Sequence, residues 1–214
     1  MQKEGDCKKV KKIENIEQLK EGATEIMKVI FSMKNQLIKP NLTIIFISGL
    51  VGYSCQAALL EKKQKNNLFI TKTKNGKNYI FSNDLNYYLV SSEKSFYNIL
   101  MGQLIQMIPE IEPFEIEPFL KRVAENIGNE KYLIGNGFNP EKIFDFEFYS
   151  SKWKEFNDIL KKYCKTPDEW PILFSISMTK FLEVIINTYG IETYFYFILI
   201  SFENALYVSK ISQL

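Results

Sequence analysis

The C-terminal part of the chain predicts a helix that is apolar almost all round, and this helix restricts the fold more than any other segment. We expect it from about Glu192 to Lys210. Its apolar side chains crowd more than half of the circumference before Glu203: Tyr194, Phe195, Phe197, Ile198, Leu199, Ile200 and Phe202. A surface helix keeps an apolar stripe of only about 100°. This helix therefore has to be covered on several sides, either by the rest of the chain or by a second copy in a homodimer.

Two other apolar segments are candidates to cover it. A helix that ends at Gly190 is expected over residues 172–189 and is the obvious neighbour. Residues 41–65 allow two interpretations. The β-branched content of Thr43 to Ile47 favours a strand followed by a helix near Gly49, whereas the length of the run favours one buried helix. We expect the helix, in which Gly49 and Gly52 would let a neighbouring helix approach closely.

The remaining segments are mostly amphipathic helices. They are expected over residues 13–39, 82–89, 95–108, 118–127 and 150–163, with Ser82 as one cap, Ser92 or Ser95 as another, and stops at Pro40, Pro109 and Gly128. Residues 109–118 read as an extended linker and residues 129–147 as irregular. The fold class is therefore mainly α, with one globular domain over residues 13–214 and a disordered or frayed segment over residues 1–12.

One antiparallel β-hairpin is expected at about residues 68–81. Asn75 and Gly76 separate two β-rich runs, and this pair favours a type I′ turn because both residues tolerate positive φ. A lone hairpin is marginally stable in water, so it has to pack on helices or pair with another strand.

The absence of histidine excludes large classes of enzyme. Of 214 residues none is histidine, so Ser-His-Asp and Cys-His catalysis and zinc sites with histidine ligands are excluded. Cys7, Cys55 and Cys164 have no regular spacing, and Cys55 reads as a small buried side chain. We expect no metal site and no cofactor. An enzyme would have to use carboxylates and a divalent cation. The acidic segment 110–117, with Asp145 and Glu147 downstream, is the candidate for such a site but is more typical of a solvated linker.

Charge and hydropathy give little support for nucleic acid or membrane. The net charge is +2, Arg122 is the only arginine, and abundant lysine suggests a low-G+C genome, typically bacterial. Weak nucleic-acid binding through the basic hairpin 62–77 stays open, because Phe69, Tyr79 and Phe81 interleave with its lysines. The N-terminal residues do not resemble a secretion signal, and the longest apolar runs, 42–51 and 194–202, are too short to span a bilayer. We expect a cytoplasmic protein without a membrane partner.

Three polar residues inside apolar helices are the candidates for a ligand pocket. Gln56 has to find a partner, as a hydrogen bond between helices or in a pocket wall, and we favour the bond. Glu203 and Asn204 interrupt the C-terminal helix. A buried Glu203 would mark a site, but a wetter helix face is the simpler interpretation. A deep pocket lined by all three would indicate a small-molecule ligand, and a flat apolar patch would indicate a protein partner.

No motif identifies an activity. We expect a non-catalytic binding or protein-interaction domain, of the adaptor or immunity type, whose partner is another protein or a second copy of itself. The alternative is an enzyme that depends on carboxylates and a divalent metal. A nucleic-acid binder is the third hypothesis.

Overall fold

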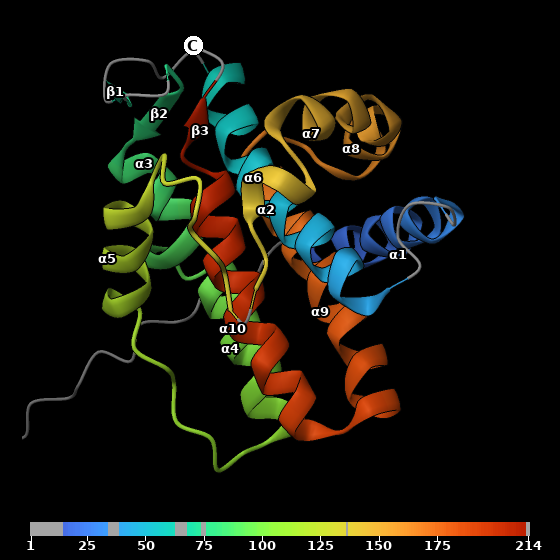
Figure 1. The fold of residues 1–214 in the computed structure, drawn as a ribbon. Coiled ribbons are helices and arrows are strands. Elements are labelled where there is room, and N and C mark those ends of the chain that lie inside the picture. Colours follow the sequence, from blue (N-terminus) through green and yellow to red (C-terminus); the bar gives the residue numbers. More distant parts are fainter. Residues whose placement is uncertain (1–14, 34–38, 63–67, 74–75, 136, 213–214) are drawn as a thin grey trace, which may run out of the picture.

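The computed structural model describes residues 15–33, 39–62, 68–73, 76–135 and 137–212 (Figure 1). Within them the helices are α1 Ile16–Ser32, α2 Pro40–Glu61, α3 Asn83–Asn86, α4 Phe96–Met107, α5 Glu117–Asn126, α6 Pro140–Ile143, α7 Phe146–Trp153, α8 Asn157–Tyr163, α9 Glu169–Tyr189 and α10 Ile191–Val208. A π-helical turn, Tyr87–Ser91, follows α3, and a 3-10 turn, Lys154–Phe156, joins α7 to α8. The strands are β1 Phe69–Lys72, β2 Asn78–Phe81 and β3 Ile211–Ser212. The mainly α prediction with a small hairpin is confirmed.

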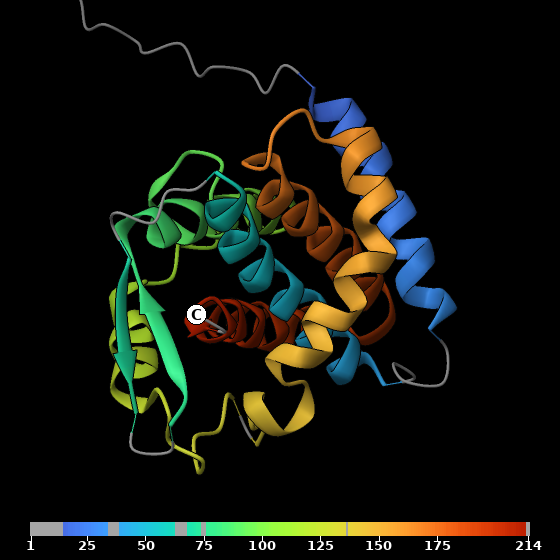
Figure 2. The same cartoon turned by 90° about the horizontal axis from the view of Figure 1, so that it is seen from above.

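Helix α10 lies in the middle of the molecule. Figure 2, seen from above, shows the other elements arranged around it. Helix α2 crosses it, α9 runs back along it, and α4 and α5 contact it from other directions. Tyr194, Ile198 and Phe202 are fully buried. The chain itself therefore covers most of this helix, whereas Phe195 and Leu199 are half-buried.

Helix α2 resolves the ambiguity over the described part of residues 41–65. It is one helix with Pro40 in its first turn, and Ile44 to Ile47 are all fully buried. Proline suits this position because the first helical N–H has no partner within the helix. A Cβ at Gly52 would lie 2.4 Å from the carbonyl oxygen of Ala205 in α10. The expected close approach of a neighbouring helix at Gly52 is therefore confirmed.

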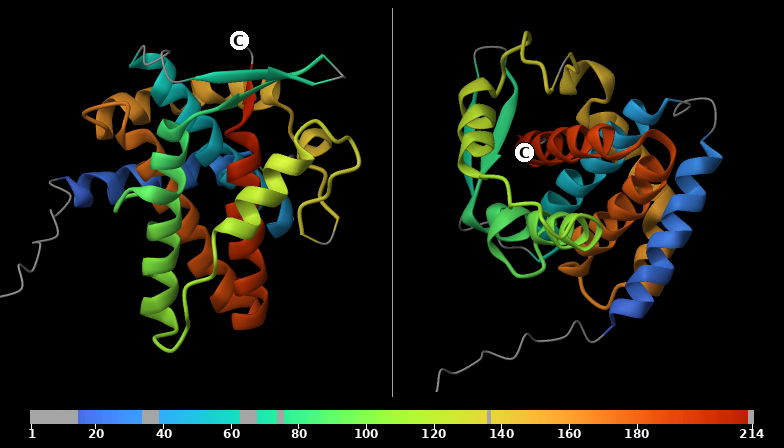
Figure 3. Two further views of the ribbon diagram at one scale, coloured as in Figure 1. Left: turned by 90° about the vertical axis from the view of Figure 1, so that its left-hand side faces the viewer. Right: turned by 90° about the horizontal axis from the view of Figure 1, so that it is seen from below.

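The hairpin lies across one end of the bundle (Figure 3). Strand β2 is central in the order β1-β2-β3 and pairs antiparallel with both neighbours. The expected pairing with another strand is thus supplied by β3. The Gly76 N–H donates to the Thr73 carbonyl at 2.9 Å, and Gly76 has a φ of +84°. Gly76 is therefore the fourth residue of that turn, not the third as in the predicted type I′ arrangement, and Asn75 lies outside the described residues.

Several boundaries differ from prediction because capping residues decide them. The helix expected to begin at Ser150 begins at Phe146, since the Asp145 carboxylate accepts from the Phe148 N–H at 2.8 Å. The segment expected to be irregular contains α6 and an isolated bridge between Ile134 and Phe138. Ser82 and Ser95 cap their helices as predicted. The segment 1–12, expected to be frayed, lies outside the described residues.

Helices α2 and α9 are long and apolar enough to cross a membrane by length and composition alone. In the structure 83% of the apolar window of α2 and 61% of that of α9 are buried against the rest of the chain. Such burial is typical of the core helices of a soluble globular protein.

Candidate functional site

Gln56 ties α2 to the C-terminal segment. Its side-chain amide donates to the carbonyls of Val208 at 3.2 Å, Ser209 at 2.7 Å and Ile211. These carbonyls end α10 and begin β3, where the last helical carbonyls have no partner within the helix. The expected hydrogen bond to a neighbouring helix is therefore confirmed, and this side chain has a structural role.

Asn204 joins the same two helices one turn further along. Its side-chain amide donates to the Ile45 carbonyl at 2.8 Å and to the Ser48 hydroxyl at 2.9 Å. Tyr149 donates to the same Ile45 carbonyl at 3.2 Å, so α7 joins this contact. The Asn204 side-chain oxygen is buried and has no hydrogen-bond partner within the described part of the chain.

Glu203 is buried, so the interpretation of a wetter helix face is wrong. Only 1% of this residue is exposed. The carboxylate accepts from Arg122 of α5 at 2.6 Å and from the Tyr132 hydroxyl. Burial raises its pKa, and these two donors oppose that shift. The only arginine of the chain therefore neutralises the carboxylate inside the most apolar helix.

The three predicted residues do not form one pocket. Gln56 of α2 faces the end of α10, Asn204 of α10 faces α2 one turn away, and Glu203 faces α5 and the connector that follows it. None of them lines either of the two hollows described below. Apart from the Asn204 side-chain oxygen, their buried polar atoms bind other parts of the chain, as buried polar groups normally do. They hold the fold together.

Sequence reasoning missed Lys210, which is 5% exposed. Its ammonium donates to the Asn86 side chain at 3.2 Å and lies over the ring of Phe81. Burial lowers its pKa from 10.5 to about 8. A lysine just after a helix normally points to water. The burial of Lys210 could not be predicted from the sequence, because the strand β3 that follows has only two residues and shows no pattern.

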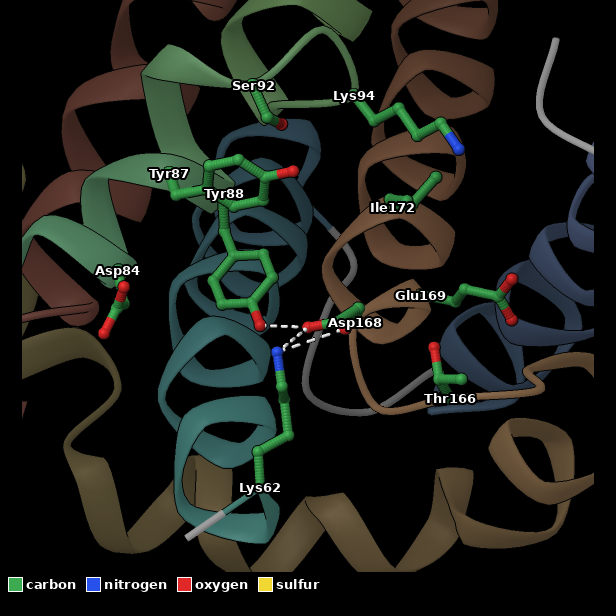
Figure 4. Close-up of a pocket in the computed structure, with 10 residues that line it drawn as sticks. All are labelled: Lys62, Asp84, Tyr87, Tyr88, Ser92, Lys94, Thr166, Asp168, Glu169 and Ile172. Atoms are coloured by element: carbon green, nitrogen blue, oxygen red, sulfur yellow. Dashed lines mark hydrogen bonds and ion pairs between the residues drawn. The ribbon is translucent and has the colours of Figure 1, made fainter. Parts of the chain in front are cut away.

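A hollow of about 460 Å³ lies where three segments distant in the sequence meet (Figure 4). The C-terminal end of α2, the π-helical turn and the start of α9 supply its walls. At its centre the Asp168 carboxylate accepts from Lys62 at 2.8 Å and from the Tyr88 hydroxyl. Burial and this carboxylate raise the Tyr88 pKa, so the phenol keeps its proton and donates it to the hydrogen bond.

The charged groups around Asp168 already bind one another. Lys62 is paired with Asp168, and Glu169 accepts from the Lys165 backbone N–H at 2.6 Å. Lys62 and Lys94 face three carboxylates, Asp84, Asp168 and Glu169, so the lining has an excess of negative charge. Lys62 and Tyr88 join α2 and the π-helical turn to the start of α9. The Asp168 carboxylate therefore links these three elements through hydrogen bonds.

Strand β1 is the open edge of the sheet. Its residues Phe69, Ile70 and Lys72 are exposed, whereas Tyr79 and Ile80 of β2 are buried. Phe69 is 68% exposed and Ile70 is 45% exposed. Of the three aromatics that suggested base stacking, Tyr79 is buried, Phe81 is half-buried with the Lys210 ammonium over its ring, and Phe69 alone is exposed.

The remaining sequence features fit structural roles. Glu110, Glu112, Glu115 and Glu117 are exposed, and no group of three potential metal ligands occurs among the described residues. Phe114 anchors their segment against Phe202, with ring centroids 5.3 Å apart. Cys55 is fully buried, and burial raises its pKa, so the thiol stays protonated.

No family model, no curated protein and no solved structure matches this chain.

Proposed function

We propose that the protein is a non-catalytic protein-interaction domain that binds an extended acidic segment of a partner along the free edge of β1. The observation that carries the proposal is the pairing pattern of that strand. Thr73 donates to the Lys77 carbonyl at 3.0 Å, so this pair is hydrogen-bonded. Because bonded and non-bonded pairs alternate in antiparallel strands, Ile70 and Lys72 direct their N–H and C=O groups away from β2.

The outward backbone groups are accompanied by exposed side chains. An added strand gains affinity from main-chain hydrogen bonds and specificity from alternate side chains. Phe69 and Ile70 lie on opposite faces of β1, so each would contact one face of such a strand. Proteins commonly protect an open edge with charge or proline. Here only Lys72, at the far end of the strand, serves that purpose.

The lysines in and near the hairpin favour an acidic partner. Lys72 and Lys77 are exposed in the hairpin, and Lys63, Lys65 and Lys74 lie close to them in the sequence, outside the described residues. These ammonium groups attract glutamate and aspartate, and long-range attraction of this kind raises association rates. An extended acidic segment would pair its backbone with the outward groups of β1 and place its carboxylates near these lysines.

The interior supports a role without catalysis. The chain has no histidine, and the buried acid Glu203 is held by Arg122 and Tyr132. In the hollow around Asp168 the carboxylate is held by Lys62 and Tyr88. Acid-base catalysis needs a group that is free to exchange a proton with a substrate. These groups instead hold parts of the chain together.

The test is binding of a fluorescent, end-capped peptide of alternating glutamate and valine, about six residues long, the length of a common strand. We expect saturable binding that a lysine-valine peptide of the same length does not reproduce. Ile70→Pro removes an outward N–H without breaking the ladder to β2, so it should weaken binding at least about tenfold. Ile70→Val keeps the backbone and should bind like the original protein.

Two further measurements keep the result interpretable. Circular dichroism and the urea midpoint show whether Ile70→Pro is folded, and Lys72→Glu weakens acidic-peptide binding without changing the backbone. Failure of the original protein to bind, or equal binding by Ile70→Pro, would overturn the proposal. Tight binding of a mixed single-stranded oligonucleotide that Ile70→Pro leaves unchanged would assign the lysines to nucleic acid instead.

A further inference from the structure

A second hollow, of about 500 Å³, is lined in part by residues 164–167, which directly precede Asp168. Its walls come from the end of α2, the α7–α8 region and the start of α9. Thr166 lines both hollows. The volume is within the range of about 300 to 1,000 Å³ that is typical of small-molecule sites.

Both tryptophans of the chain line this hollow. The Trp153 and Trp170 rings lie 5.6 Å apart at an interplanar angle of 64°. Phe174 and Tyr53 pack against Trp153 at 5.5 Å and 5.1 Å, which holds the ring in place. Both tryptophans are half-buried, and neither indole N–H donates to another group in the described part of the chain, so both can donate to a bound molecule. The hollow therefore offers a rigid aromatic wall with two unused donors.

The charge of this lining differs from that around Asp168. Lys161 and Lys165 face a single carboxylate, Glu61, so positive charge is in excess. Within the described part of the chain neither lysine side chain forms an ion pair. Asn157 and Thr166 add polar groups that are able to donate hydrogen bonds. Burial raises the pKa of Cys164 to about 12, so its thiol adds no negative charge.

We propose that this hollow binds a small molecule with a planar aromatic ring and an anionic group. The ring packs against Trp153 and Trp170, and the phosphate or carboxylate lies near Lys161 and Lys165. The indole N–H groups donate to acceptors on the ligand. This site is separate from the β1 edge and does not depend on the function proposed for that edge.

Tryptophan fluorescence reports on the site directly, because no tryptophan lies elsewhere in the chain. Adenosine 5′-monophosphate is the first probe, excited at a wavelength where it does not absorb. Adenosine supplies the ring without the charge, and ribose 5-phosphate supplies the charge without the ring. We expect a saturable change with the nucleotide and at least about tenfold weaker binding of either half, since each lacks one class of contact.

Matched variants locate the site. Lys165→Met should weaken binding of the nucleotide about tenfold, equivalent to about 1.4 kcal/mol. Lys94→Met, which removes a lysine from the hollow around Asp168, should leave binding unchanged. Trp153→Phe and Trp170→Phe should each retain a ligand-dependent change from the tryptophan that remains.

Three results would overturn the proposal. The first is the lack of any saturable change with adenosine 5′-monophosphate, uridine 5′-monophosphate or benzoate. The second is adenosine binding as tightly as its monophosphate. The third is an equal loss of binding in Lys94→Met and Lys165→Met. Because none of these experiments involves β1, they leave the proposed peptide site untouched.

Discussion

The interface between α2 and α10 and the edge strand β1 use polar groups in opposite ways. Between the helices, Gln56 and Asn204 donate to backbone carbonyls of the facing segment. Along β1, the N–H and C=O groups of Ile70 and Lys72 point away from the sheet. Buried polar groups are costly unless paired, whereas exposed ones are solvated until a partner replaces the water. The polar groups in the interior therefore hold the helices in place, whereas the backbone polar groups along β1 are available to bind a partner.

The largest effect is expected from Gly52→Ala. The added methyl group would lie 2.4 Å from the Ala205 carbonyl oxygen and 2.8 Å from the Ser209 nitrogen, and both are backbone atoms that cannot rotate away. We expect a loss of about 3 kcal/mol or more in the free energy of unfolding, measured by urea denaturation. Gly102→Ala in α4 is the matched control. It meets nothing within 4 Å and should raise stability by about 0.5 kcal/mol.

Removing the partner of the buried carboxylate should have the next largest effect. Arg122→Met leaves Glu203 buried with the Tyr132 hydroxyl and the Gly135 backbone N–H as neutral donors, at a cost of about 2 kcal/mol, reduced because Arg122 is half exposed. Burial already raises the Glu203 pKa, so the carboxyl contributes most stability when protonated, and this contribution is lost as pH rises through its folded pKa. The cost should therefore be small in acid and grow toward neutral pH.

The double variant decides whether charge causes this loss. Glu203→Gln, combined with Arg122→Met, keeps the shape of the side chain at position 203 and removes its negative charge. The double variant should recover most of the stability that Arg122→Met loses at pH 7. If Arg122→Met were as stable as the original protein at pH 7, the buried ion pair would not matter to the fold.

Replacing Lys210 should change the free energy of unfolding by a smaller amount, and it should stabilise the protein instead of destabilising it. Its pKa is about 8 in the folded protein against 10.5 for an unperturbed lysine, so the unfolded state binds more protons between these values. Stability from this group therefore rises with pH across that window. Lys210→Met should stabilise the protein by about 1 to 2 kcal/mol at pH 7 and flatten the rise between pH 8 and 10. A rise of unchanged slope in the variant would contradict the assignment.

The sequence predicted elements better than it predicted contacts. Periodicity and stop signals identified α2, α9 and α10, because their apolar patterns extend over several turns. The Gln56 hydrogen bond followed from the cost of burying an amide. The partner of Glu203 could not be predicted, because Arg122 is 81 residues away and reads as an ordinary surface arginine. The tryptophan hollow was hidden for the same reason, since segments distant in the sequence supply its walls.

The most direct test of the contrast between interior and edge is amide hydrogen exchange, measured by nuclear magnetic resonance with and without the glutamate-valine peptide. We predict that the peptide slows exchange at Ile70 and Lys72, whose N–H groups point outward, and leaves the amide of Thr71, which faces β2, nearly unchanged. Slowed exchange confined to other parts of the molecule, or equal slowing at all three residues of β1, would contradict the account.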